Sequence, residues 1–119
     1  MLNEEDHQQM LNEAYKLLLR LGVSPRYRGY HHAAYSIFLC AQQPDWMFLT
    51  TKYVYPEVAK HFHTTWQSVE RNIRTVVGVC WKTNPALICE LCSYKLTHKP
   101  CAKEFIAILS TYLRLNNAV

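Results

Sequence analysis

The residues whose types and spacing best suit a specific chemistry lie in one short segment, between positions 67 and 75. Arg71 and Arg74 can each donate two hydrogen bonds to guanine. Glu70 can accept a hydrogen bond from cytosine, and Gln67 can pair with adenine. The same stretch carries apolar residues at spacings of four, three and four, namely Val69, Ile73, Val76 and Cys80. The two sets lie on opposite sides of a helix, so the segment predicts a helix that reads bases in double-stranded DNA.

A solvated surface helix remains an alternative for this segment, because Glu70 and Arg74 are spaced to pair on any exposed helix. The charge distribution favours DNA. The net charge is +4, but four acids precede the first base, Lys16, and residues 15–119 carry 13 bases against 5 acids, a net charge of +8. Such a surplus suggests a polyanionic partner, although a solubilising surface has the same composition.

A second constellation could bind metal. Cys89-x-x-Cys92, with His98 and Cys101, has the residue types of a Cys3His zinc site. We expect no metal there, because both Cys89 and Cys92 fall on a predicted helix, whereas structural zinc sites place paired cysteines on a turn. The pairs His31-His32 and His61-x-His63 have no third ligand, and we expect them to face solvent or phosphate.

The sequence shows no pattern typical of an enzyme, a membrane protein or a secreted protein. The nine acids are scattered, no glycine-rich phosphate loop is present, and no nucleophile has an orienting base, so we expect neither an enzyme nor a bound cofactor. No apolar run approaches the roughly 18 to 20 residues of a membrane span, and we expect no membrane contact. Five cysteines, an odd number, and an acidic N-terminus favour a cytoplasmic protein over a secreted one.

The elements that must position these residues are predicted to be helices. Only 3 Gly and 5 Pro occur in 119 residues, and no alternating strand pattern is present. The spacing predicts a compact all-α domain of about six helices. The first helix covers residues 2–21 and stops at Gly22. Ser24-Pro25 has the pattern of a helix start. Gly29 then interrupts the chain before a second helix over residues 30–41.

The centre of the chain predicts a helix-turn-helix. A short helical segment begins at Trp46, and Pro56 must end or restart it. Helices over residues 56–62 and 65–82 follow, and Thr64 with Gln67 has capping-box spacing at the head of the second. Further helices are expected over residues 85–92 and around residues 105–113.

Several ordered motifs support this interpretation. They are G-V-x-P followed by R-G-Y, then TKYVYPEVAKHF, TTWQSVERNIR, and a closing EFIA with LRL. Over about residues 14–115 the chain resembles the C-terminal effector domain of stage-zero sporulation protein A, a sporulation response regulator. The resemblance implies an all-helical DNA-binding domain that regulates transcription, reads TGTCGAA-like boxes, and dimerises along tandem boxes.

The resemblance also implies which residues touch DNA. Glu70, Arg71 and Arg74 match the family's base- and backbone-contacting positions, and Gln67 and Ser68 occupy two contact positions before them. Ser68 departs from the usual arginine, and losing a bidentate guanine contact costs about 1 to 3 kcal/mol of discrimination. Further positions in the predicted contact set are Thr75, which replaces a usual histidine, and the phosphate-contacting Lys99 and Lys103.

The family's receiver domain has no counterpart in this sequence, where an acidic helix over residues 1–21 precedes the effector domain of residues 22–119. We expect that helix to pack on the domain, and we expect no phosphorylation control within the chain. The expected partners are double-stranded DNA and either a second copy on tandem sites or a full-length relative. The alternative is a protein-interaction module, zinc-stapled or not, that modulates such a relative without touching DNA.

Overall fold

The computed structural model describes residues 3–116, so the outer ends of the two predicted units, residues 1–2 and 117–119, lie outside the described residues. The described chain is all-α and contains no strand, which confirms the predicted fold class. Its elements are α1 (Glu4–Arg20), α2 (Arg28–Gln42), η1 (Pro44–Leu49), η2 (Thr50–Val54), α3 (Tyr55–His61), α4 (Trp66–Thr83), α5 (Pro85–Leu91) and α6 (Ala102–Asn116).

Helix α1 has a defined start and stop. The Asn3 side chain accepts a hydrogen bond from the backbone N–H of Asp6, and the Asp6 carboxylate accepts one from the N–H of Asn3, forming a capping box. At the other end Gly22 has φ of +97°, a left-handed conformation that favours glycine. The predicted stop at Gly22 is therefore confirmed.

The start of α2 differs from its prediction in two ways. Ser24-Pro25 forms a turn instead of a helix start, with the Ser24 hydroxyl accepting a hydrogen bond from the N–H of Arg26. The helix begins at Arg28, so Gly29 lies inside it and does not interrupt it. The reason is contact with α4, because a Cβ atom on Gly29 would overlap the backbone carbonyl of Asn72. Glycine lets the two helices approach closely.

The segment before the helix-turn-helix is helical throughout but changes type. Residues Pro44–Leu49 form a 3-10 helix, and Thr50–Val54 form a π-helix that continues directly into α3. Pro56 lies in the first turn of α3, at the point where the helix changes from π to α type. Proline thus restarts the helix, which is one of the two outcomes that the sequence allowed.

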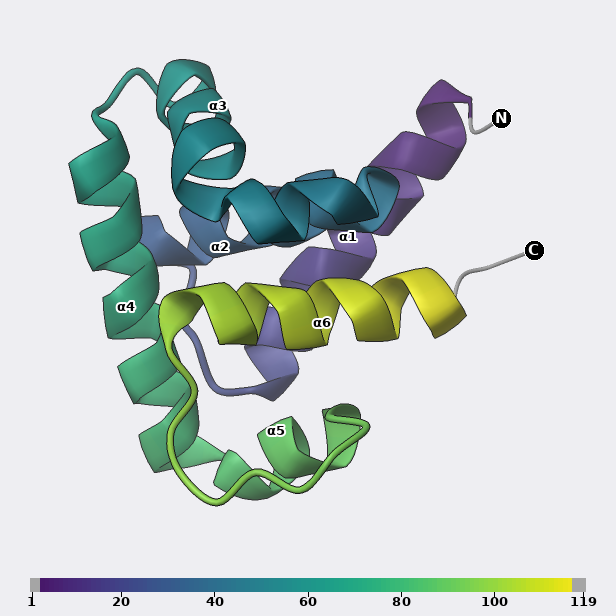
Figure 1. The fold of residues 1–119 in the computed structure, drawn as a ribbon, viewed down its shortest axis with the longest axis vertical. Coiled ribbons are helices and arrows are strands. Elements are labelled where there is room, and N and C mark those ends of the chain that lie inside the picture. The colour runs from purple at the N-terminus through teal and green to yellow at the C-terminus, as the bar shows by residue number, and fades with distance from the viewer. Residues whose placement is uncertain (1–2, 117–119) are drawn as a thin grey trace.

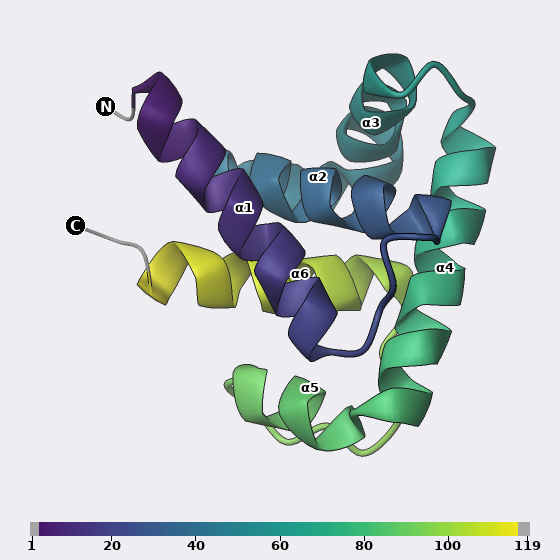
Figure 2. The ribbon, with the colours of Figure 1, turned by 180° about the vertical axis from the view of Figure 1, so that it is seen from behind.

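The helices pack around α2, which contacts α1, α4 and α6. In both views α2 and α6 run side by side, while α4 crosses their ends along one edge (Figures 1 and 2). The first turns of α1 and the last turns of α6 lie on the opposite side of the molecule from α4. This arrangement leaves one long face of α4 open to solvent.

The connection from α4 to α6 carries the short helix α5. Asn84 caps α5 by accepting a hydrogen bond from the N–H of Leu87, and its side-chain amide donates one to the carbonyl of Arg20 in α1. The chain then passes without regular helix through residues 92–101 and starts α6 beside α4. Lys99 and Lys103 are thereby carried to the neighbourhood of the predicted recognition helix.

Candidate nucleic-acid interface

A four-residue turn, residues 62–65, joins α3 to α4. His63 has φ of +55°, in the left-handed region where histidine is one of the more tolerated residues. This reversal lets the N–H of Thr64 donate to the carbonyl of Ala59 at 2.9 Å. The predicted helix-turn-helix is therefore present, with α4 as its second helix.

The cap of α4 lies one residue later than predicted. Thr65, not Thr64, is the N-cap, and its side chain accepts a hydrogen bond from the N–H of Ser68 at 3.2 Å. The Thr65 hydroxyl also donates to Oγ of Ser68 at 3.0 Å, and Nη2 of Arg71 lies 3.4 Å from the same oxygen. Ser68 thus links the cap to the first arginine of the exposed face.

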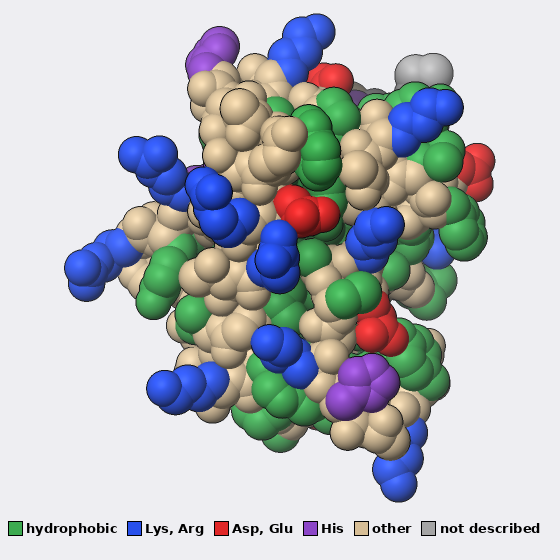
Figure 3. Space-filling view, turned by 60° about the vertical axis from the view of Figure 1, so that its left-hand side comes forward, with side chains coloured by type: hydrophobic (Ala, Val, Ile, Leu, Met, Phe, Trp, Pro, Cys, Tyr) green, Lys and Arg blue, Asp and Glu red, His purple; other side chains and the backbone are tan. Residues whose placement is uncertain are grey.

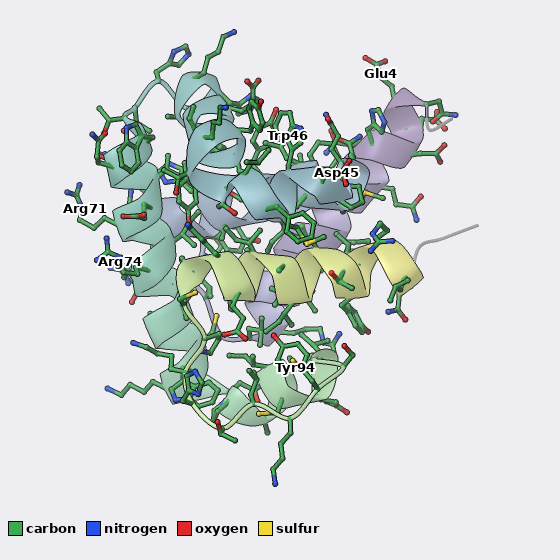
Figure 4. All side chains as sticks on the ribbon, in the orientation of Figure 1. Glu4, Asp45, Trp46, Arg71, Arg74 and Tyr94 are labelled. Carbon is green, nitrogen blue, oxygen red and sulfur yellow. The ribbon has the colours of Figure 1, made fainter. Side chains whose placement is uncertain are left out.

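The two faces of α4 divide as the spacing predicts. The apolar residues are buried in the common core: Val69, Ile73, Val76, Val77 and Cys80. On the other side Gln67, Arg71, Arg74 and Thr75 are exposed, and Ser68 and Glu70 are half-buried. Arg71 and Arg74 project away from the body of the protein (Figure 4). The Thr75 hydroxyl donates its proton to the carbonyl of Arg71, so its oxygen can only accept a hydrogen bond from a further partner.

Glu70 and Arg74 form the i, i+4 ion pair that the sequence suggested. Nη2 of Arg74 donates to Oε1 of Glu70 at 3.1 Å, and the two side chains are 65% and 33% exposed. An exposed pair of this kind contributes only about 0.3–0.5 kcal/mol to folding. Little folding free energy is therefore lost when Arg74 exchanges this carboxylate for another hydrogen-bond acceptor.

On one flank of α4 the structure brings together four of the predicted contact residues. We call this hollow the α6-side cavity; it has a volume of about 590 Å³ and is lined by Tyr55, Glu70, Arg74, Val77, Lys99, Pro100, Cys101, Ala102 and Lys103. Three cations and one carboxylate face it. Lys99 and Lys103 thus lie beside the recognition helix, although 25 or more residues separate them from Arg74 in sequence.

The opposite flank holds a second hollow, the α2-side cavity, of about 540 Å³. Its lining is Arg28, His31, His32, Phe62, His63, Thr64, Ser68, Arg71 and Asn72. Sequence reasoning placed Ser68 and Arg71 in the contact set but missed Arg28, which starts α2 next to Gly29. The sequence signal that could have identified Arg28 is its position as the basic residue of the R-G-Y motif.

His32 contradicts its prediction, because it is buried and does not face solvent or phosphate. Its ring packs against Phe62, with centroids 5.2 Å apart, and its Nδ1 lies 3.4 Å from Nδ2 of Asn72 on α4. Burial, followed by the neighbouring His31 and Arg28, lowers the pKa of His32. His32 is therefore a contact between α2 and α4.

Basic side chains dominate the face that carries α4. Lys and Arg side chains spread across this face, and few acidic side chains interrupt them (Figure 3). Glu4, at the start of α1, lies on the far side of the molecule from Arg71 and Arg74 (Figure 4). The charge asymmetry of the sequence is thus also an asymmetry in space, and it directs a positive surface toward a polyanion.

The zinc alternative is not assembled in the described part of the chain. Within residues 3–116 no three His, Cys, Asp or Glu residues lie together as metal ligands. Cys89 is exposed on α5, and Cys92 is the C-cap after that helix ends, so the expectation that both lie on the helix is wrong for Cys92. Among the same residues, no helix combines the length and apolarity needed to cross a bilayer.

Residues 14–113 match the family described as "Sporulation initiation factor Spo0A C terminal". The match begins within α1, so the acids Glu4, Glu5, Asp6 and Glu13 all precede it. It covers the helix-turn-helix, both cavities and most of α6. The chain therefore belongs to the Spo0A C-terminal family, a family of DNA-binding domains that regulate transcription in sporulation.

Proposed function

We propose that this protein is a sequence-specific transcriptional regulator that reads a TGTCGAA-like box in double-stranded DNA through α4. Arg71 and Arg74 approach guanines in the major groove, Glu70 accepts from cytosine, and Gln67 and Thr75 contact neighbouring positions. Lys99 and Lys103 contact backbone phosphates on one flank. Arg28 contacts them on the other.

The observation that carries this proposal is the position of α4 between two cation-lined hollows. Arg71 and Arg74 are both exposed. Lys99 and Lys103 line the cavity on one side of the helix, and Arg28 lines the cavity on the other. Phosphates flank the major groove on both sides, so a recognition helix with cations on both flanks matches the charge of the duplex.

The experiment is a binding titration of a duplex carrying the box and of a scrambled duplex, each at several salt concentrations. We expect tighter binding to the box and a logarithm of affinity that falls linearly with the logarithm of salt concentration, because bound cations release counterions. Equal affinity for both duplexes would contradict sequence specificity. A flat salt dependence would contradict DNA binding altogether.

Ser68 is the place where the preferred box departs from that of relatives. A serine side chain is too short to bond both O6 and N7 of guanine, so one base pair should be read loosely. We expect Ser68→Arg to sharpen discrimination at that single base pair, measured with single-base variants of the box. Ser68→Ala serves as the control, and an unchanged profile for Ser68→Arg would show that position 68 does not face the bases.

We further propose that a second copy, or a full-length relative, binds beside the first on tandem boxes. On this proposal residues 1–21, which include the acidic start of α1, form a segment attached to a DNA-binding domain of residues 22–119. The acidic start of α1 lies away from the DNA-facing surface, which keeps its charge from repelling phosphates. Binding to one box and to two adjacent boxes, compared by stoichiometry, tests the pairing.

A protein-interaction role is the second candidate. The side chains of Phe48, Leu49 and Tyr53 are 86%, 40% and 41% exposed, and they lie on the 3-10 and π-helical segments before α3. Exposed apolar residues of this kind suit a protein partner. The salt titration separates the two candidates, because a module that modulates a relative without touching DNA gives no duplex binding at any salt concentration.

A further inference from the structure

The hydroxyl of Tyr55 is an exception to the usual pairing of buried polar groups. Tyr55 is the first residue of α3, and its side chain is 0% exposed. Among the described residues, its hydroxyl oxygen has no hydrogen-bond partner. Nearly all buried polar side chains in folded proteins have a partner, so an unpaired hydroxyl calls for a physical explanation. A phenylalanine of the same shape would avoid the cost.

The surroundings of this hydroxyl are the DNA-contacting residues themselves. Tyr55 lines the α6-side cavity together with Glu70 and Arg74. Burial raises the pKa of Tyr55, and the negative charge of Glu70 raises it further. The hydroxyl therefore keeps its proton at physiological pH and remains a hydrogen-bond donor close to a carboxylate.

Glu70 has acceptor capacity to spare. In the free protein its Oε1 oxygen accepts a hydrogen bond from Nη2 of Arg74 at 3.1 Å. A carboxylate has two oxygens and about four lone-pair positions. When Arg74 turns toward DNA, Glu70 loses this donor at the moment when its orientation matters for reading a base.

We propose that Tyr55 is a positioning residue for DNA recognition: as Arg74 leaves Glu70 for the duplex, the Tyr55 hydroxyl donates a hydrogen bond to the Glu70 carboxylate and holds it toward its base pair. This inference rests on the proposed function. The hydroxyl is unpaired in the free protein and paired in the complex. Its hydrogen bond therefore contributes to binding and not to folding.

The test is Tyr55→Phe, which removes the hydroxyl and little else. We expect roughly ten- to a hundredfold weaker binding to the preferred duplex, which corresponds to the loss of one hydrogen bond to a charged group. Discrimination at the base pair read by Glu70 should fall, while the thermal unfolding midpoint should stay the same or rise. A purely structural role for the hydroxyl would instead lower that midpoint and leave the discrimination profile unchanged.

A double-mutant cycle identifies Glu70 as the group through which Tyr55 acts. In a Glu70→Ala background, Tyr55→Phe should no longer change affinity for the duplex, because the acceptor is gone. Tyr30→Phe is the matched control. The Tyr30 hydroxyl already donates to the carbonyl of Tyr15 at 3.3 Å, so its removal should lower the unfolding midpoint and leave base discrimination intact.

Three results would overturn the inference. One is a Tyr55→Phe protein that binds every duplex as the wild type does. Another is additive effects of Tyr55→Phe and Glu70→Ala, which would mean that the hydroxyl acts elsewhere. The third is a wild type without preference for any duplex. That last result overturns the proposed function as well, whereas the first two leave it standing.

Discussion

Arg71 and Arg74 are the two residues whose role in DNA binding can be separated most cleanly from folding. Both side chains are exposed, and Nη2 of Arg71 lies 3.4 Å from Oγ of Ser68, while Nη2 of Arg74 lies 3.1 Å from Oε1 of Glu70. We expect Arg71→Ala and Arg74→Ala each to reduce the free energy of binding to the preferred duplex by about 1–3 kcal/mol. Titration of labelled duplex, with circular dichroism to monitor folding, measures both quantities.

The control for these variants is Arg20→Ala. Arg20 is an exposed arginine in the last turn of α1, so the change removes the same charge from another element. We expect it to leave discrimination between base pairs unchanged. Unfolding of Arg71→Ala or Arg74→Ala in circular dichroism would mean that these side chains support the core, contrary to their exposure.

His32 predicts a pH dependence of stability. Burial, His31 and Arg28 lower its pKa in the folded protein, so the unfolded chain takes up the proton at a higher pH than the folded chain does. The contribution of His32 is therefore fully present above the unfolded pKa of about 6.5 and is lost as the pH falls below it. We expect a lower urea midpoint at acidic pH than at neutral pH, and a smaller difference in His32→Gln. An equal difference in that variant would assign the effect to other groups.

At the scale of elements, Gly29 sets the distance between α2 and α4. A Cβ atom at this position would overlap the carbonyl oxygen of Asn72 and lie 2.7 Å from Cγ2 of Val76. We expect Gly29→Ala to destabilise the protein by about 1–3 kcal/mol, the usual cost of overpacking. Because it displaces α4 relative to Arg28, it should also weaken binding to the duplex.

Gly78, within α4, gives the matched control for stability. Apart from its chain neighbours and the nearby backbone of its own helix, a Cβ atom there meets no atom of the described residues within 4 Å. We expect Gly78→Ala to stabilise the protein by about 0.5–1 kcal/mol, because alanine loses less conformational entropy in a helix than glycine does. Thermal unfolding of the two variants measures the contrast. Destabilisation by both changes would show that α4 tolerates no added methyl group, and would remove the special role of Gly29.

The helices could be predicted where their position depends on nearby residues alone. The spacing of Val69, Ile73 and Val76 placed α4 and its buried face, and Gly22 placed the end of α1. The predictions were wrong where packing against a neighbouring helix determines the local structure. The sequence predicts an interruption at Gly29, but the glycine lies inside α2, where the close contact with α4 requires it.

At the scale of the whole molecule, α1 shares the core of the effector domain. Ala14, Leu17 and Leu18 are buried, and α1 packs against α2 and α6. We expect Leu18→Ala to lower the free energy of unfolding by about 2–5 kcal/mol, the cost of a cavity in a packed core. Circular dichroism and tryptophan fluorescence should follow one transition. Separate transitions for the two probes would mean that α1 and the remainder fold independently.

The sequence by itself determined the helices, the buried and exposed faces of α4, and the surplus of positive charge after Glu13. These are consequences of side-chain type and of a 3.6-residue period, which are local properties. Only the tertiary structure decided that Lys99 and Lys103 line one cavity with Arg74 and that Arg28 lines the other with Arg71. It also decided that the Tyr55 hydroxyl is buried without a hydrogen-bond partner among the described residues. These neighbours are far apart along the chain. They meet because α2, α3, α4 and α6 pack closely around one core, which fixes the relative positions of the helices and of their side chains.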